Sequence, residues 1–134
     1  MEQKYRIMLV DDHASTREAM SHFLNRQPDL IVAGEAGSGE ECLNCLDHIN
    51  PDLVVMDILL PVMNGIETTK KLKANHPHLP VMVLSNYTGR TLIKAVRDAG
   101  ASGYLGKDRA YEALIPAIRK IRDGESSFPP DIFA

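Results

Sequence analysis

The sequence predicts an α/β protein built on one parallel β-sheet with helices on both of its faces. Short apolar runs alternate with longer segments in which apolar residues recur every three or four positions, a pattern typical of strands and amphipathic helices. The run Leu53-Val54-Val55-Met56 is apolar throughout, as expected of a strand that is buried on both sides. Because five such pairs of strand and helix follow one another, a parallel sheet is favoured.

Each element has a local signal in the chain. The expected strands are residues 6–10, 30–36, 53–56, 81–85 and 103–105. The expected helices are residues 15–25, 38–49, 66–75, 89–99 and 109–123. Ser38, with Glu41 three residues later, predicts a capping box at a helix start. Asp108 is expected to be the N-cap of the last helix. Gly100 and Gly124 are expected to end the fourth and fifth helices.

Composition limits the class of protein. A chain of 134 residues has the length of one domain, and its 44% apolar and 25% charged residues are ordinary for a globular core without disulfides. The net charge of −3 gives no sign of a nucleic-acid-binding surface, and no apolar run approaches a membrane span. Since residues 1–6 lack a signal-peptide pattern, a cytoplasmic protein without membrane contact is expected.

The chain is expected to divide near residue 124. Residues 1–124 hold all the expected strands and helices. Residues 125–134 contain Pro129-Pro130 and show no periodicity, so they are interpreted as a linker or C-terminal tail.

Polar side chains stand at the ends of four expected strands. They are Asp11 and Asp12 after the first strand, Asp57 after the third, Ser85 at the end of the fourth and Lys107 after the fifth. Ligands of open parallel sheets bind outside the carboxyl ends of the strands, so these side chains are expected to share one edge. Crowded carboxylates repel one another unless a cation joins them. The sequence therefore predicts an acidic pocket for Mg²⁺, which prefers hard oxygen ligands.

The same five residues suit phosphoryl chemistry, although each also has an ordinary structural interpretation. A carboxylate such as Asp57 is able to act as a nucleophile and form an acyl phosphate. Lys107 is able to pair with phosphoryl oxygens, and Ser85 to donate a hydrogen bond to one of them. Alternatively, Asp11-Asp12 is an N-cap, Ser85 a turn residue and Lys107 a solvated surface lysine. Their occurrence together at successive strand ends favours the phosphoryl interpretation.

These motifs resemble the receiver domain of two-component response regulators. The matching segments are Leu9-Val10-Asp11-Asp12-His13, Val55-Met56-Asp57-Ile58 with Pro61 and Asn64-Gly65, Val83-Leu84-Ser85, and Ala99-Gly100-Ala101-Ser102-Gly103-Tyr104-Leu105 with Lys107. The resemblance covers residues 5–124 and is greatest to the NarL/FixJ-type subfamily. It implies a flavodoxin-like (βα)5 three-layer sandwich whose parallel sheet has the strand order 2-1-3-4-5.

The resemblance also implies a role for each site residue. Asp57 is expected to accept a phosphoryl group from the phosphohistidine of a sensor histidine kinase. Asp11, Asp12, Asp57 and the backbone carbonyl of Leu59 are expected to hold Mg²⁺, and Lys107 to pair with the phosphoryl oxygens. Ser85 and Tyr104 are the expected switch residues, which move when the phosphoryl group arrives. The face formed by the fourth helix, fifth strand and fifth helix is then expected to change shape.

The expected function is a phosphorylation-dependent switch that controls an output, in particular transcription. No enzyme activity is expected beyond self-phosphorylation and self-dephosphorylation. Members of this subfamily usually continue into a helix-turn-helix domain, so DNA contact is expected only through such a domain outside this chain, and phosphorylation is expected to promote homodimers. A free-standing receiver that acts by protein–protein contact is the alternative output.

Two other functional classes are alternatives to the switch. An aspartate-nucleophile phosphatase of the haloacid dehalogenase type shares the strand-end Asp, Ser and Lys. It usually has a second acid two residues after the nucleophile, where this chain has Leu59. A flavin-binding module is disfavoured because Asp11 and Asp12 would repel a flavin phosphate. Leu59 and Tyr87 stand where the receiver family tunes water access, and their bulk predicts slow self-dephosphorylation.

Overall fold

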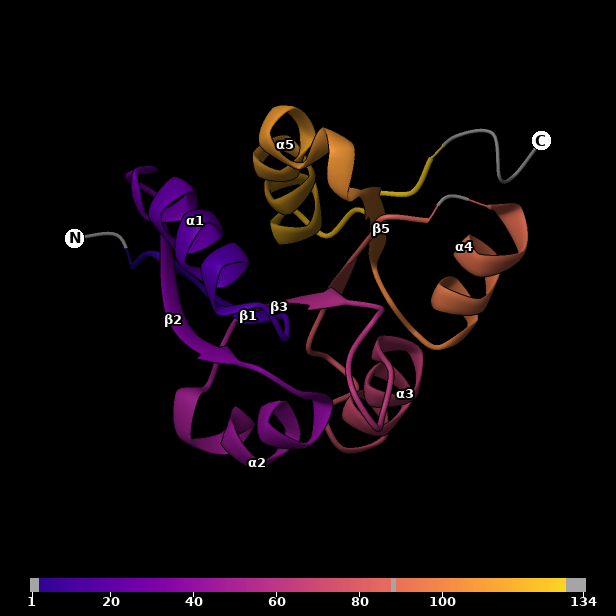
Figure 1. The fold of residues 1–134 in the computed structure, drawn as a ribbon. Helices are drawn as coiled ribbons and strands as arrows, with labels where there is room; N and C mark the ends of the chain where they lie inside the picture. Colours follow the sequence, from indigo (N-terminus) through magenta and orange to yellow (C-terminus); the bar gives the residue numbers. More distant parts are fainter. Residues whose placement is uncertain (1–2, 88, 130–134) are drawn as a thin grey trace.

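The structure is a computed structural model that describes residues 3–87 and 89–129. The strands are β1 (Tyr5–Val10), β2 (Leu30–Ala36), β3 (Leu53–Asp57), β4 (Val81–Ser85) and β5 (Gly103–Gly106). The helices are α1 (Ala14–Asn25), α2 (Gly39–Ile49), α3 (Gly65–Asn75), α4 (Arg90–Asp98) and α5 (Ala110–Arg122), with a 3₁₀ turn η1 (Lys107–Arg109) before α5. The strands form one parallel sheet in the order β2-β1-β3-β4-β5 (Figure 1). The predicted fold class and strand order are confirmed.

Two cores lie on the two faces of the sheet. Side chains alternate along β1, so that Ile7 and Leu9 face α1 and α5, whereas Met8 and Val10 face α2, α3 and α4 (Figure 1). The core under α1 and α5 also includes Met20, Leu24, Leu114 and Ile118, and the opposite core includes Cys42, Leu46, Leu72, Ile93 and Val96. Burial of both faces explains why β3 is apolar at each position before Asp57.

Most of the predicted helix ends are found. The Ser38 hydroxyl accepts a hydrogen bond of 3.1 Å from the Glu41 amide, which is one half of the capping box. The Glu41 carboxylate accepts at 3.3 Å from Gly37 rather than from Ser38. Gly100 and Gly124, which follow α4 and α5, have φ angles of 103° and 90°, so both adopt the left-handed conformation that ends a helix.

The start of the last helix differs from the prediction. Asp108 is not the N-cap of α5, because the chain first makes the 3₁₀ turn η1 across Lys107–Arg109. The N-cap position of α5 falls on Arg109, which makes no side-chain capping hydrogen bond. Lys107 is the first residue of this turn and therefore lies before α5. Helix propensity alone does not predict the turn.

The described part of the segment after α5, which the sequence predicts to be a linker or tail, contacts the domain. Ser127 forms a parallel bridge with Gly103 of β5, and Phe128 packs against the core under α2, α3 and α4. Residues 130–134 lie outside the described part. Within the described residues, no helix is long and apolar enough to cross a bilayer.

An ion-pair cluster joins the start of β2 to α5. Arg119 binds both carboxylate oxygens of Asp29, at 2.9 and 3.0 Å, and Arg122 binds one of them at 2.7 Å. The Arg119 hydrogen bonds are the main reason that the pKa of the Asp29 carboxyl lies well below its ordinary value. Because the folded pKa is lowered, this carboxylate stabilises the fold at neutral pH and ceases to do so in acid.

We therefore expect Asp29→Asn to lower the free energy of unfolding at pH 7 by about 1 kcal/mol, a value reduced for solvent screening. The loss, measured by urea unfolding, should persist down to the unfolded carboxyl pKa of about 3.9 and then shrink as the pH falls further. Asp98→Asn, at an exposed carboxylate on α4 that pairs with Arg97 at 3.6 Å, is the control and should change stability little. A loss for Asp29→Asn that is constant from pH 7 to pH 3 would contradict the assignment.

Candidate functional site

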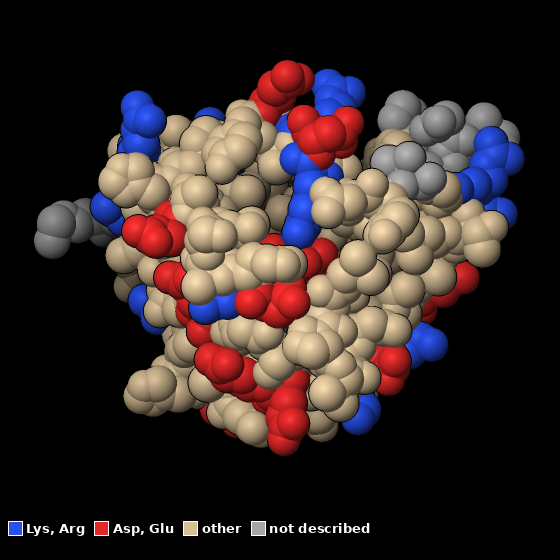
Figure 2. Space-filling model, in the orientation of Figure 1, with Lys and Arg blue, Asp and Glu red and all other residues tan. Residues whose placement is uncertain are grey.

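The strand register brings the predicted residues to one edge of the sheet. Val10 pairs with Met56, so Asp11 and Asp57 follow equivalent positions on the adjacent strands β1 and β3. Asp57 itself pairs with Leu84, which places Ser85 one residue further along β4. Acidic side chains gather near the middle of the face shown in Figure 2, with a basic side chain directly above them. The predicted convergence of these strand ends is therefore present in the fold.

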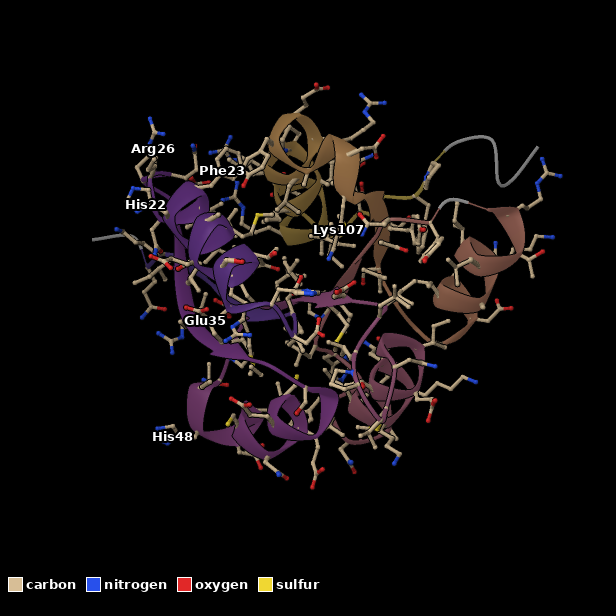
Figure 3. All side chains as sticks on the ribbon, viewed as in Figure 1. His22, Phe23, Arg26, Glu35, His48 and Lys107 are labelled. Carbon is tan, nitrogen blue, oxygen red and sulfur yellow. The ribbon has the colours of Figure 1, made fainter. Side chains whose placement is uncertain are left out.

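Lys107 joins the two buried carboxylates. Its ammonium lies 3.1 Å from Asp11 Oδ2 and 3.1 Å from Asp57 Oδ2. The side chain reaches from the turn after β5 toward the end of β3, at the centre of Figure 3. One cation between two carboxylates offsets part of their repulsion. Because Lys107 contacts both buried carboxylates, it is not a solvated surface lysine.

Burial and charge act in opposite directions on these groups. Burial raises the pKa of Asp57, the nearby Lys107 lowers it, and the net shift is upward. Burial alone would lower the pKa of Lys107, but its hydrogen bonds to Asp11 and Asp57 outweigh that effect and raise the pKa. Lys107 is thus protonated. The Asp57 carboxylate beside it is buried, and this burial disfavours its charged form.

Asp12 and His13 form the rim of the site. The His13 Nδ1 atom lies 3.1 Å from Asp12 Oδ1 and 3.4 Å from Asp11 Oδ1, and these three residues are able to place ligand atoms within 4.8 Å of one another. The His13 amide also donates to Asp11 at 2.8 Å. Carboxylate oxygens on a partly exposed rim fit a hard cation such as Mg²⁺. Sequence reasoning used His13 only as part of a motif and missed its contacts with both acids.

The loop after Asp57 is held close to the carboxylate. The Leu59 amide donates to Asp57 Oδ1 at 3.3 Å, and the Leu59 residue is 52% exposed. The Gly65 amide donates to the carbonyl of Ile58 at 2.8 Å, and the Asn64 side chain caps α3 by accepting from Glu67 at 2.9 Å. The motif Asn64-Gly65 therefore folds the loop back onto the site.

Ser85 and Tyr104 are linked through Tyr87. The buried Ser85 hydroxyl accepts a hydrogen bond of 3.0 Å from the Tyr87 amide. The Tyr104 hydroxyl donates to the Tyr87 carbonyl, and the Tyr104 residue is only 2% exposed. The two predicted switch residues thus contact the same residue, Ser85 through the Tyr87 amide and Tyr104 through the Tyr87 carbonyl. Sequence spacing alone does not reveal this arrangement.

A parallel five-stranded fold with acids at the ends of β1 and β3 and a lysine after β5 defines a receiver-type module. The family model for the response regulator receiver domain matches residues 7–119. The chain belongs to this family of two-component signalling domains, and the recognition made from the sequence is confirmed.

Individual relatives agree with this assignment. The transcriptional regulatory protein DegU of Brevibacillus brevis is 34% identical over 131 residues, which are 98% of this chain and 56% of DegU. The response regulator VraR of Staphylococcus aureus is 33% identical over 127 residues, 95% of this chain and 61% of VraR. The chain therefore spans little more than half the length of these relatives.

Solved structures show the same architecture. The crystal structure of a LuxR-family two-component response regulator from Aurantimonas sp. SI85-9A1 superposes with a TM-score of 0.91 at 34% identity. The match covers 97% of this chain and 93% of that one. Receiver domains are signalling modules related here to transcription regulators, and the phosphatase and flavin-module alternatives gain no support from these matches.

Proposed function

We propose that this domain accepts a phosphoryl group on Asp57 from the phosphohistidine of a sensor histidine kinase. The observation that carries the proposal is the buried Asp57 carboxylate, whose Oδ2 lies 3.1 Å from the Lys107 ammonium at the open edge of the sheet. This carboxylate is almost wholly buried and has a fixed cation beside it.

In the proposed reaction an Asp57 carboxylate oxygen attacks phosphorus and forms a new P–O bond. The P–N bond to the kinase imidazole breaks, and its electron pair returns to the imidazole nitrogen. Lys107, freed in part from Asp57 as that carboxylate is esterified, pairs with a phosphoryl oxygen. The Ser85 hydroxyl donates to another phosphoryl oxygen, which fixes the orientation of the group.

A divalent cation belongs to the same proposal. The residues proposed to hold Mg²⁺ are Asp11, Asp12, Asp57 and the backbone carbonyl of Leu59. When bound there, the ion supplies positive charge that offsets the phosphoryl oxygens during transfer. Support comes from Asp11, Asp12 and His13, which are able to place ligand atoms within 4.8 Å of one another.

Phosphorylation is proposed to act on Ser85 and Tyr104. A phosphoryl group brings nearly two negative charges and three acceptor oxygens to one point, so Ser85 is drawn toward Asp57. The Tyr87 segment is then perturbed, and Tyr104 changes position. The surface of α4, β5 and α5 carries the change to an output. No turnover of an external substrate is proposed.

The wider setting follows from the family. We propose a cytoplasmic protein whose output is transcription, since the relative DegU carries that description. Contact with DNA is proposed only through a domain outside this chain, and homodimerisation on phosphorylation remains part of the proposal. A free-standing receiver that contacts another protein is the alternative output.

Mass spectrometry after incubation with acetyl phosphate and Mg²⁺ tests the central step. We expect wild type to gain the mass of one phosphoryl group and Asp57→Ala to gain none, because Asp57 is the proposed acceptor and Asp11, the other buried carboxylate beside Lys107, is assigned to Mg²⁺. Omission of Mg²⁺ should suppress the gain. An equal gain in the Asp57→Ala variant would contradict the assignment of the acceptor.

The lifetime of the acyl phosphate is expected to depend on Leu59. We propose that the exposed residues Leu59 and Tyr87, which lie on the loops after Asp57 and Ser85, limit the approach of water to the acyl phosphate. Leu59→Asn should therefore accelerate loss of the phosphoryl group by about tenfold, which is less than the effect of a fully positioned general acid or base. Decay followed by mass spectrometry checks this, with Leu59→Met as the apolar control. Equal decay rates in wild type and Leu59→Asn would count against it.

A further inference from the structure

The chain returns to the sheet after α5 and pairs with the edge of β5. The Tyr104 amide donates to the Ser127 carbonyl at 2.9 Å, and the Ser127 amide donates to the Ser102 carbonyl at 2.9 Å. In Figure 1 the yellow segment passes alongside β5 and leaves on the side of α4. Ser127 thus makes two backbone hydrogen bonds, one with Tyr104 of β5 and one with Ser102, which directly precedes that strand of four residues.

Gly103 makes this close approach possible. A Cβ atom at residue 103 would lie 2.9 Å from the Ser127 carbonyl oxygen and 2.9 Å from the Met82 sulfur. The missing side chain leaves the space that the Ser127 backbone fills. The next residue, Phe128, is partly buried against the core cluster that includes Tyr104, so the contact has both a backbone and an apolar component.

The same segment is connected to the phosphorylation site by consecutive hydrogen bonds. Ser85 accepts from the Tyr87 amide, and the Tyr87 carbonyl accepts from the Tyr104 hydroxyl. The Tyr104 backbone amide in turn holds Ser127. Tyr104 therefore contacts the loop after β4 through its side chain and the C-terminal segment through its main chain.

We propose that residues 125–129 are an intramolecular ligand of the β5 edge, and that phosphorylation of Asp57 weakens their docking. The inference rests on the proposed function. When Ser85 turns toward the phosphoryl group, the Tyr87 amide loses its acceptor and the loop that holds the Tyr104 hydroxyl rearranges. Movement of Tyr104 within β5 then disturbs the Ser127 hydrogen bonds and the packing of Phe128. Release of the segment uncovers the β5 edge and gives the domain a way to transmit its state to a partner.

Hydrogen exchange on the full chain tests the proposal directly. The reporters are the Tyr104 and Ser127 amides, which depend on docking, and the Val55 and Val83 amides of the central strands are the reference. With acetyl phosphate and Mg²⁺, protection of the two reporters should fall by about fivefold or more, the usual scale of coupling between sites. Protection of the reference amides should stay the same.

The same samples distinguish failure of the proposed function from failure of the docking inference. Intact mass shows whether Asp57 carries a phosphoryl group. If the mass does not change, the proposed function fails. If the mass rises while protection of Tyr104 and Ser127 is unaltered, the function stands and the docking inference is overturned.

Variants test the coupling in the opposite direction. Phe128→Ala and Ser127→Pro, which removes the amide that donates to Ser102, should reduce Tyr104 protection without phosphorylation. By reciprocity, both should bind beryllofluoride with Mg²⁺ more tightly than wild type, by up to the same factor. Ser127→Ala keeps both backbone groups and should bind like wild type. Phe23→Ala, which removes an aromatic contact with Tyr111 on the opposite face, is the matched control. Unchanged beryllofluoride affinity in both Phe128→Ala and Ser127→Pro would overturn the inference.

Discussion

Replacement of Gly65 by alanine is expected to destabilise the protein by about 3 kcal/mol or more, at the upper end of overpacking effects, and to prevent phosphorylation of Asp57. A Cβ atom at this position would lie 2.3 Å from the Asp57 carbonyl oxygen and 2.8 Å from the Ile58 Cα atom. Both are backbone atoms, so no side chain is able to turn away. The backbone at Asp57, the proposed acceptor residue, has to move, and with it the carboxylate that Lys107 and Leu59 hold.

Gly89→Ala is the matched control for this substitution. Gly89 has an extended φ of −177°, and nothing lies within 4 Å of an added Cβ atom. Urea unfolding should give wild-type stability for Gly89→Ala and a large loss for Gly65→Ala. If Gly65→Ala retained both wild-type stability and acetyl phosphate reactivity, the close approach of the loop to α3 would not be a requirement of the site.

Lys107→Met is expected to slow phosphorylation by acetyl phosphate by about 100-fold, the effect of removing one preorganised electrostatic group from a reaction centre. The substitution leaves Asp11 and Asp57 without the ammonium that lies 3.1 Å from each. Since Lys107 lowers the Asp57 pKa against the effect of burial, that pKa should rise further in the variant. The rate of mass gain at saturating Mg²⁺ measures the loss.

Lys120→Met on the exposed side of α5 removes the same charge from the protein as a whole and serves as the control. Its phosphorylation rate should match wild type, because a solvated charge contributes little across water. Lys107→Arg should recover part of the rate if charge alone matters. A wild-type rate in Lys107→Met would show that the bridge between the carboxylates is structural rather than part of phosphoryl transfer.

The fold was predictable because its elements alternate regularly and its strands are apolar. Residues 53–56 are buried on both faces, so their composition excludes a half-exposed antiparallel strand. The strand order came from family resemblance and not from composition. The N-cap of α5 was predicted wrongly at Asp108, and α5 begins one residue later than expected, because the chain first makes a 3₁₀ turn over Lys107–Arg109 that has no signal in local propensity.

The site was predictable to the extent that it depends on strand ends. Parallel strands bring their carboxyl ends together, so Asp11, Asp57 and Lys107 were expected to meet, and they do. The contacts of His13 with two acids and the link through Tyr87 depend on loop conformation, which no periodicity records. Ser127 was missed for a similar reason, since a single bridging residue has no pattern of its own.

The bridge at Ser127 also affects whether β5 is able to pair with a strand of another molecule. β5 is the last strand of the sheet, and an outermost strand with free amides and carbonyls invites another chain to extend the sheet. Here part of that border is already satisfied from within the same polypeptide. A shortened chain that stops at Gly124 would leave it bare, and concentrated solutions of such a fragment should self-associate more readily than those of the parent.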